Sequence, residues 1–351
     1  NVSTFKIMRH TKFFKLSSIL LGALVLGFFT SCEGPKGPAG ADGTNGVDGN
    51  EVCLDCHNLT TKSEVTAEYM TSGHAAGTTV GYAGGRSGCA MCHSDQGFVE
   101  TQYTGQDTTA MDIAAPQEIQ CQTCHAFHSS LDFENEGNAA LRAYMPVDLL
   151  MYRAADPTAP AVTIDLGAGS NLCASCHQPR RVGPAITAGV PDNDSTYVSS
   201  SHYGPHHGPH STSLAGLGAA EIGSGYPAPG EGSTHVTNSD CVSCHMHEGN
   251  HSWEPEVEGC NVAGCHEGNP LTTVSDNSRQ MTFKTLMSTL ETKLKTAGLL
   301  DADGHPVKGT FPSDEVAALY NYEWLVDDRS NGVHNFPYLE TLLNNSIAVF
   351  P

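Results

Sequence analysis

The chain has 351 residues, enough for one large domain or two smaller ones. Only 39% of the residues are hydrophobic, while 37 Gly and 19 Pro indicate many turns, which argues against a doubly wound sheet or a barrel. The formal net charge is −21, and a surface of that sign repels phosphate backbones, so we expect no nucleic acid partner. Packing alone does not explain 13 Cys and 18 His. We therefore look for the function in these two residue types.

Residues 1–31 have the pattern of a secretory signal peptide. A basic region precedes the apolar residues 16–29, a stretch too short for a comfortable membrane span of about 20 residues. The basic residues are Lys6, Arg9, Lys12 and Lys15. The segment ends Phe29-Thr30-Ser31-Cys32, which resembles the lipobox of bacterial lipoproteins, in which the cysteine becomes the acylated first residue. The alternatives are an uncleaved anchor and an ordinary signal with an incidental cysteine.

We expect lipidation of Cys32, with export of the chain out of the reducing cytoplasm. Removal of residues 1–31 leaves 13 basic and 38 acidic residues, a net charge of −25. Residues 32–50 then carry a glycine at every third position, which resembles a short collagen G-x-y repeat. The glycines are Gly34, Gly37, Gly40, Gly43, Gly46 and Gly49. The run is short and contains few prolines, so we expect a hydrated spacer rather than a stable triple helix.

The twelve cysteines after Cys32 form six pairs, and a histidine follows each pair directly. Five pairs read C-x-x-C-H and the last reads C-x4-C-H. Such a motif attaches a c-type haem through two thioether bonds, and its histidine binds the iron as the proximal ligand. The six motifs, numbered one to six, are Cys53, Cys56 and His57; Cys89, Cys92 and His93; Cys121, Cys124 and His125; Cys173, Cys176 and His177; Cys241, Cys244 and His245; and Cys260, Cys265 and His266.

Disulfides and zinc sites also use pairs of cysteines. Disulfides suit an exported protein but place no demand on the next residue, and zinc ribbons need two pairs for each metal without an obligatory histidine. The chain instead resembles a hexahaem c-type cytochrome over residues 51–351. The resemblance implies six haem c groups and their iron as cofactors.

The remaining histidines decide whether each iron is closed or open on its distal side. Eleven are left for six irons once the proximal ligands and His10 are set aside. Segments that resemble distal-ligand elements of multihaem proteins single out His74, His128, His206, His235, His251 and His334. His202, His207 and His210 lie close enough to His206 to replace it, so this choice stays open. His247 and His305 are the spare histidines.

We expect a mostly irregular chain with α-helices, in which stacked haems form the core of residues 51–270. About 36 residues are available for each haem over residues 53–266, too few for a separate protein core around each. Residues 271–351 are expected to form a helical segment packed on the haem region. Helices are predicted around residues 283–297, from Ser313 to about Arg329, and from Pro337 onward. His334 would come from the loop between the last two helices.

Electron transfer through mostly or fully bis-histidine haems is the function that this pattern favours, with no catalytic residue of its own. We expect a location at the bacterial cell surface, outer membrane or periplasm, with a lipid anchor in the membrane. The partners would be redox proteins such as other cytochromes, or an extracellular acceptor. A homo-oligomer or filament of copies is a further hypothesis. The alternative is a multihaem reductase of a small oxyanion or nitrogen compound with one open haem, near Arg86 or the pair Arg180 and Arg181.

Overall fold

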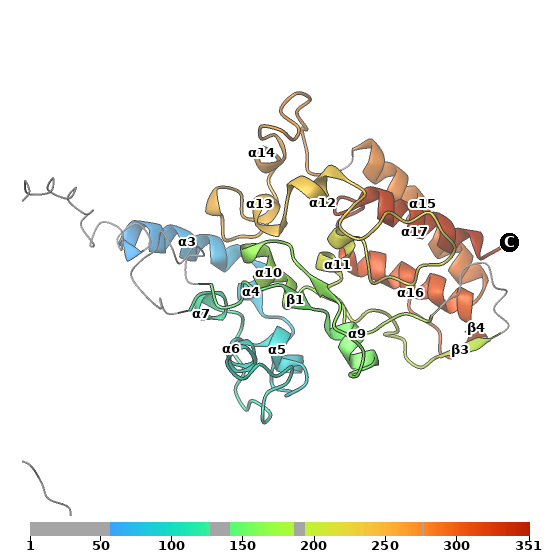
Figure 1. Ribbon diagram of the computed structural model, residues 1–351, viewed down its shortest axis with the longest axis horizontal. Coiled ribbons are helices and arrows are strands. Elements are labelled where there is room, and N and C mark those ends of the chain that lie inside the picture. Colours follow the sequence, from blue (N-terminus) through green and yellow to red (C-terminus); the bar gives the residue numbers. More distant parts are fainter. Residues whose placement is uncertain (1–56, 127–140, 186–193, 276) are drawn as a thin grey trace, which may run out of the picture. The chain divides into compact units, whose positions relative to one another are not determined.

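The computed structural model describes residues 57–126, 141–185, 194–275 and 277–351 (Figure 1). Residues 57–351 belong to one compact unit. The expectations for the signal peptide, Cys32, the spacer, Cys53, Cys56 and His128 lie outside the described residues. The described part is rich in helices and irregular segments and has few strands, as the sequence predicted.

Most helices before residue 270 are only one or two turns long. They are α3 (Leu59–Thr71), α4 (Gly73–Ala76), α5 (Ala90–His93), α6 (Asp95–Thr104), α7 (Cys121–Cys124), α9 (Leu150–Ala155), α10 (Ala168–Ala174), α11 (His210–Ala215), α12 (Thr234–Asn238), α13 (Cys241–His245) and α14 (Val257–Cys260). A π-helical turn, η2 (Val80–Gly84), and a 3-10 turn, η3 (His247–Gly249), accompany them. Helices this short are marginal by themselves, so tertiary contacts or a bound group must hold them.

The strands form two small antiparallel ladders. β1 (Val147–Asp148) pairs with β2 (Thr163–Ile164), and Val147 lies opposite Ile164. β3 (Ser195–Val198) pairs with β4 (Gly309–Pro312), and Ser195 lies opposite Pro312. The second ladder joins the middle of the chain to its C-terminal helices, because β4 directly precedes α16 (Ser313–Asp328).

The three helices predicted near the C-terminus are confirmed as α15 (Ser278–Thr296), α16 and α17 (Phe336–Ala348). Asn277 caps α15 by accepting from the backbone N–H of Gln280, whose side chain accepts from the Asn277 N–H in return. Gly298 follows that helix with φ +79°, the left-handed backbone expected beyond a helix end. Pro337 lies in the first turn of α17, where its missing N–H costs no hydrogen bond.

These three helices contain about half of the buried apolar residues in the described part of the chain. They contact one another and lie side by side in Figure 1. Fully buried side chains on them include Leu290, Leu294, Leu319, Trp324, Leu339, Leu342 and Leu343. The core also reaches the middle of the chain, since Trp324 Nε1 donates to Ser213 Oγ at 2.9 Å and Asn321 Nδ2 donates to the carbonyl oxygen of Ala220 at 2.8 Å. The C-terminal helices therefore pack directly against the segment that precedes motif five.

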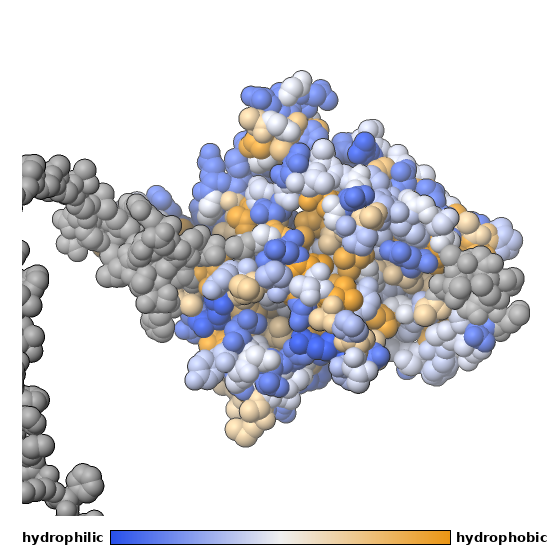
Figure 2. Space-filling view, in the orientation of Figure 1, coloured by the Kyte–Doolittle hydropathy of each residue, from blue (hydrophilic) through white to orange (hydrophobic). Residues whose placement is uncertain are grey.

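Helices near the cysteine motifs have few buried side chains. The 13 residues of α3 include none that is buried, and the same holds for α12, α13 and α14. Large apolar side chains stay exposed in this part of the chain, among them Leu59, Met70, Tyr82, Tyr103 and Met111. Figure 2 shows apolar residues at the surface near the middle of the face in view, with hydrophilic residues around them. The stacked-haem core stays a prediction, and a bound apolar group would give these helices a surface on which to pack.

Candidate functional site

Four of the five described motifs adopt one helical turn that ends at the histidine. The backbone N–H of His125 donates to the carbonyl of Cys121 at 2.9 Å, and that of His177 donates to Cys173 at 2.9 Å. Residues three and four positions apart lie on the same face of a helix. Each turn therefore presents two thiols and an imidazole to one side, as attachment of one group by all three requires.

The wide motif reaches the same result by a longer loop. α14 ends at Cys260, and the chain returns so that the backbone N–H of His266 donates to the Cys260 carbonyl at 3.1 Å. Gly264 provides a left-handed position in this loop, with φ +82°. Asn261 fastens the loop through two hydrogen bonds, of 2.8 and 2.9 Å, to the backbone of Leu271. The four intervening residues thus close the motif rather than separate its ends.

Motif two is attached to motif three through a buried carboxylate. Asp95 is 2% exposed and accepts from Thr123 Oγ1 at 2.6 Å and from Gln122 Nε2 at 2.5 Å, both in α7. Asp95 begins α6, which lies tightly on α5: a Cβ added at Gly97 would be 2.3 Å from the carbonyl oxygen of Ala90. Only glycine permits this approach of α6 to the helix that holds Cys92.

Thiols of different motifs also meet. The Cys92 thiol of motif two is a neighbour of the Cys176 thiol of motif four, and the Cys173 thiol of motif four is a neighbour of the Cys241 thiol of motif five. The Cys173 thiol lowers the pKa of the Cys241 thiol to about 7, although burial opposes this shift. α13 and α14 are in contact, so motifs five and six are neighbours. Motif four therefore lies between motifs two and five.

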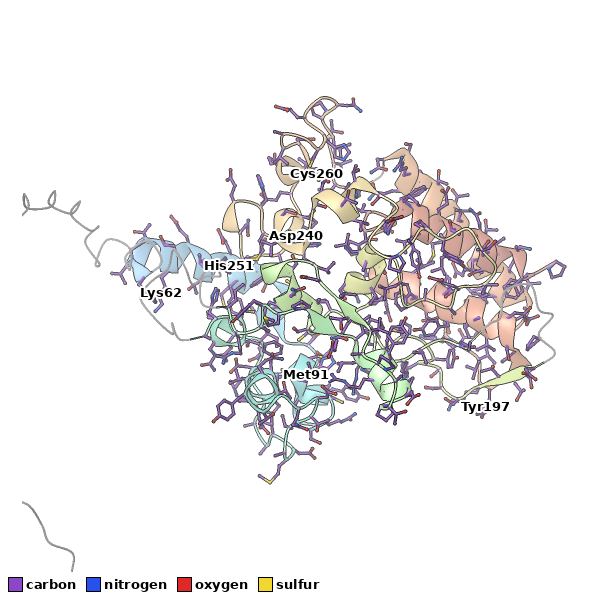
Figure 3. All side chains as sticks on the ribbon, viewed as in Figure 1. Lys62, Met91, Tyr197, Asp240, His251 and Cys260 are labelled. Carbon is purple, nitrogen blue, oxygen red and sulfur yellow. The ribbon has the colours of Figure 1, made fainter. Side chains whose placement is uncertain are left out.

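Three proximal histidines face histidines from distant segments. The ring centroids are 6.1 Å apart for His74 and His177, 6.4 Å for His125 and His251, and 6.2 Å for His235 and His266. Two imidazoles bound to opposite sides of one iron would have centroids about 6 Å apart, because each metal–nitrogen bond is about 2 Å long. In Figure 3, His251 lies near the end of α3, and its backbone N–H donates to Glu68 Oε2 of that helix at 2.9 Å.

Ordinary edge-to-face packing of two rings covers the same range of distances, about 4.5–7 Å. The identity of the two histidines in each contact favours ligand pairs over ordinary packing. Each of the three contacts joins the histidine of a cysteine motif to a distal candidate selected from the sequence, namely His74, His235 or His251. One further contact at this spacing, between His210 and His334 at 6.1 Å, joins two histidines that belong to no cysteine motif.

Hydrogen bonds at Nδ1 leave Nε2 available for a metal. The Nδ1 atoms of His235, His245 and His251 lie 2.7, 2.8 and 2.7 Å from the carbonyl oxygens of Val333, Trp253 and Gly249. A carbonyl only accepts, so each Nδ1 carries the proton and each Nε2 keeps its lone pair. This tautomer is the one that metal-binding histidines adopt.

The pair of His74 and His177 is held in the neutral state. His177 keeps an accessible edge, but the protein atoms around it desolvate the ring, and this effect, with the charges of His210 and His74, lowers its pKa to about 3. Burial also lowers the pKa of His74. Among the described residues, none hydrogen-bonds the buried Nδ1 of His74. Two neutral imidazoles in contact suit coordination, which requires the unprotonated nitrogen.

The sequence left the choice of distal ligand open among His202, His206, His207 and His210. In the structure, members of this cluster lie near two different motifs. His206 lies near motif two, because the charge of His93 helps lower the pKa of His206 to about 4, after burial and the charges of Arg180, His207 and Arg181. His210 lies near motif four, with its ring centroid 5.0 Å from that of His177. The sequence ranked His206 first and did not separate the two. A contact across the fold was needed to place His210.

His334, the last distal candidate, lies in the turn between α16 and α17. Its ring centroid is 6.1 Å from that of His210 rather than from a proximal histidine. His334 donates from Nδ1 to Oδ1 of the buried Asp328 at 2.7 Å. Burial lowers the pKa of His334, but the charge and hydrogen bond of Asp328 more than offset this and raise it. Asp328 has no signal in the sequence beyond its distance of six residues from His334.

Two of the described motifs, motifs two and five, show no such pair within the described residues. For His93 and His245, the described part of the chain shows no ring pair of this spacing with a distal candidate. His57 is described but Cys53 and Cys56 are not, so the structure does not test motif one. The described thiols and imidazoles nevertheless fit haem c, since both kinds of ligand converge at motifs three, four and six.

Comparisons with known proteins find likeness only among solved structures. The chain is similar to the outer cell wall cytochrome OcwA, with 21% identity, a TM-score of 0.48, and 80% of this chain and 48% of that chain covered. It is also similar to an undecahaem cytochrome from the S-layer of Carboxydothermus ferrireducens, with 17% identity, a TM-score of 0.46, and coverage of 79% and 40%.

The chain thus spans about half or less of the length of these two cytochromes. No family model matches the chain, and no curated protein matches its sequence. At TM-scores below 0.5, the assignment of cofactors rests on this chain's own cysteines and histidines. Among the described helices, none is long and apolar enough to cross a membrane.

Proposed function

We propose that the chain is an electron-transfer protein that holds six haem c groups, most or all of them with two axial histidines. The observation that carries this proposal is the set of three proximal–distal imidazole pairs, each with ring centroids 6.1–6.4 Å apart. Bound haem c would supply a one-electron Fe(III)/Fe(II) couple at each motif.

The chain's residues have three roles in this proposal. The cysteine pairs would hold each group covalently, and the histidine of each motif would provide one nitrogen ligand. The distal histidines would provide the second nitrogen and would leave no position for a substrate. The carbonyl oxygens of Val333, Trp253 and Gly249 keep three imidazoles in the required tautomer and orientation.

The contacts between motifs support a route that does not follow the sequence. Cys92 meets Cys176, and Cys173 meets Cys241, so the attachment sites of motifs two, four and five are consecutive in space. Motif three joins motif two through Asp95, and motif six joins motif five through α14. Neighbouring attachment sites are the arrangement that electron transfer through one chain requires.

The signal-like segment and the negative net charge support the proposed cellular location and partners. The signal-like residues 1–31 and the lipobox cysteine Cys32 support a lipid-anchored protein at the outer membrane or cell surface. The net charge of −21 favours partners with basic patches, such as other cytochromes, and makes association sensitive to salt. An extracellular acceptor, and a homo-oligomer or filament of copies, belong to the same proposal.

A second function, reduction of a small oxyanion or nitrogen compound, is favoured by one observation at motif two. His93 lacks a ring pair of ligand spacing among the described residues, and the charge of Arg180 reaches it and contributes to the lowering of its pKa, after burial. An arginine beside an open iron would bind an anion. Arg86 is a weaker candidate, because its guanidinium already lies over the Tyr82 ring, 4.3 Å from the centroid.

Low-temperature electron paramagnetic resonance of the oxidised protein, with haem quantified in the same sample, tests both functions. Six haems per chain, all low-spin, would support electron transfer with every iron closed. A high-spin fraction of about one-sixth would mean one open iron and would favour the reductase. A purified, exported chain without covalent haem would refute both.

A further inference from the structure

One short turn positions two of the distal candidates. Residues 329–335 connect α16 to α17, and three of them, Arg329, Asn331 and Gly332, have φ values of +56°, +51° and +89°. Left-handed positions in close succession fold the turn back on itself. His235 meets the carbonyl oxygen of Val333 at 2.7 Å, and His334 meets Asp328 at 2.7 Å. Two ligand candidates from distant parts of the chain therefore share one support.

The two imidazoles have different partners at Nδ1. His235 donates to a neutral carbonyl, whereas His334 donates to a carboxylate whose residue is 1% exposed. Ser330 Oγ donates to the other carboxylate oxygen, so both oxygens of Asp328 are hydrogen-bonded. A carboxylate in such a place pulls the Nδ1 proton more strongly than a carbonyl does, and this makes Nε2 a stronger donor to a metal.

The adjacent residue on α16 offers an internal comparison. Asp327 accepts from Nδ1 of His207 at 3.0 Å, but the His207 side chain is 75% exposed. Water competes for such an exposed pair and screens its charge. Asp327 and Asp328 thus form the same contact in two environments, and only the contact of Asp328 lies where its charge is weakly screened.

We propose that Asp328 is a positioning residue that orients His334 and strengthens it as a ligand, so that the Asp328 carboxylate lowers the reduction potential of the haem bound by His334. This inference rests on the proposed function. A negative charge beside the ligand stabilises Fe(III) over Fe(II), which is the reason for the sign.

Asp328→Asn is the direct test, because asparagine keeps an acceptor oxygen and removes the charge. We expect the equilibrium ratio of Fe(III) to Fe(II) at one haem to fall about tenfold. For a one-electron couple, this change raises the reduction potential of that haem by about 59 mV. The measurement is an anaerobic redox titration of the visible spectrum. Asp327→Asn is the matched control, and its titration curve should overlay that of the wild type.

Haem quantification separates failure of this inference from failure of the proposed function. Wild-type protein without haem would refute the proposed function. If both proteins hold six haems and no potential differs between wild type and Asp328→Asn, the role of Asp328 is overturned. If Asp328→Asn does not fold, Ser330→Ala replaces it. Loss of the Ser330 hydrogen bond makes the carboxylate more basic, so the same single potential should then fall, and an unchanged potential would overturn the proposal.

Discussion

Replacing His235 with alanine tests whether the imidazole pairs are ligand pairs. His235 faces His266 with ring centroids 6.2 Å apart, and its Nδ1 bonds to the Val333 carbonyl at 2.7 Å. Loss of that single hydrogen bond should cost about 1 kcal/mol of stability, which a domain of this size tolerates. We therefore expect a folded protein in which one of six irons, that of motif six, has lost its distal ligand.

The magnitude of the spectral change follows from this count. About one-sixth of the haem should become high-spin in electron paramagnetic resonance, and added imidazole should restore the low-spin state by occupying the open position. His305→Ala is the matched control, because the His305 side chain is 61% exposed and next to Asp301, far from any motif in sequence. Fully low-spin haem in His235→Ala, with haem content unchanged, would show that the ring contact is packing and not coordination.

Two further predictions concern stability. Leu339 in α17 is fully buried, so Leu339→Ala should lower the free energy of unfolding by about 2–5 kcal/mol, and a loss below about 1 kcal/mol in denaturant unfolding would contradict the core assignment. Burial, followed by the charge of Asp327, raises the pKa of Glu323 to about 8 from 4.5. The folded state then holds a proton that the unfolded state lacks, so this residue's contribution to stability falls as pH rises from about 4.5 to about 8. The thermal midpoint of Glu323→Gln should therefore increase relative to that of the wild type between about pH 5 and about pH 9. If the difference between the two midpoints does not change with pH, the raised pKa of Glu323 is refuted.

The local shape of each cysteine motif follows from its sequence, because a short spacing is enough to define one helical turn. Two thiols and an imidazole within five residues lie on one helical turn wherever the chain goes, and α7 and α13 show this turn at Cys121–Cys124 and Cys241–His245. The C-terminal helices are equally local, since caps and apolar spacing define α15 without help from its neighbours. The haem number, the lipid anchor and the distal role of His128 stay predictions.

The pairing of histidines is decided by tertiary structure. Nothing in the sequence near His177 indicates that His74 faces it, or that His210 rather than His206 lies beside it. Such contacts join segments that are far apart in the chain, and packing of the intervening helices sets their distances. The support of His334 by Asp328 has the same origin, because only burial turns an ordinary acidic residue at a helix end into a charge that water does not screen. Local spacing determined which cysteines and histidines share one turn, and the fold decided which of the histidines face one another.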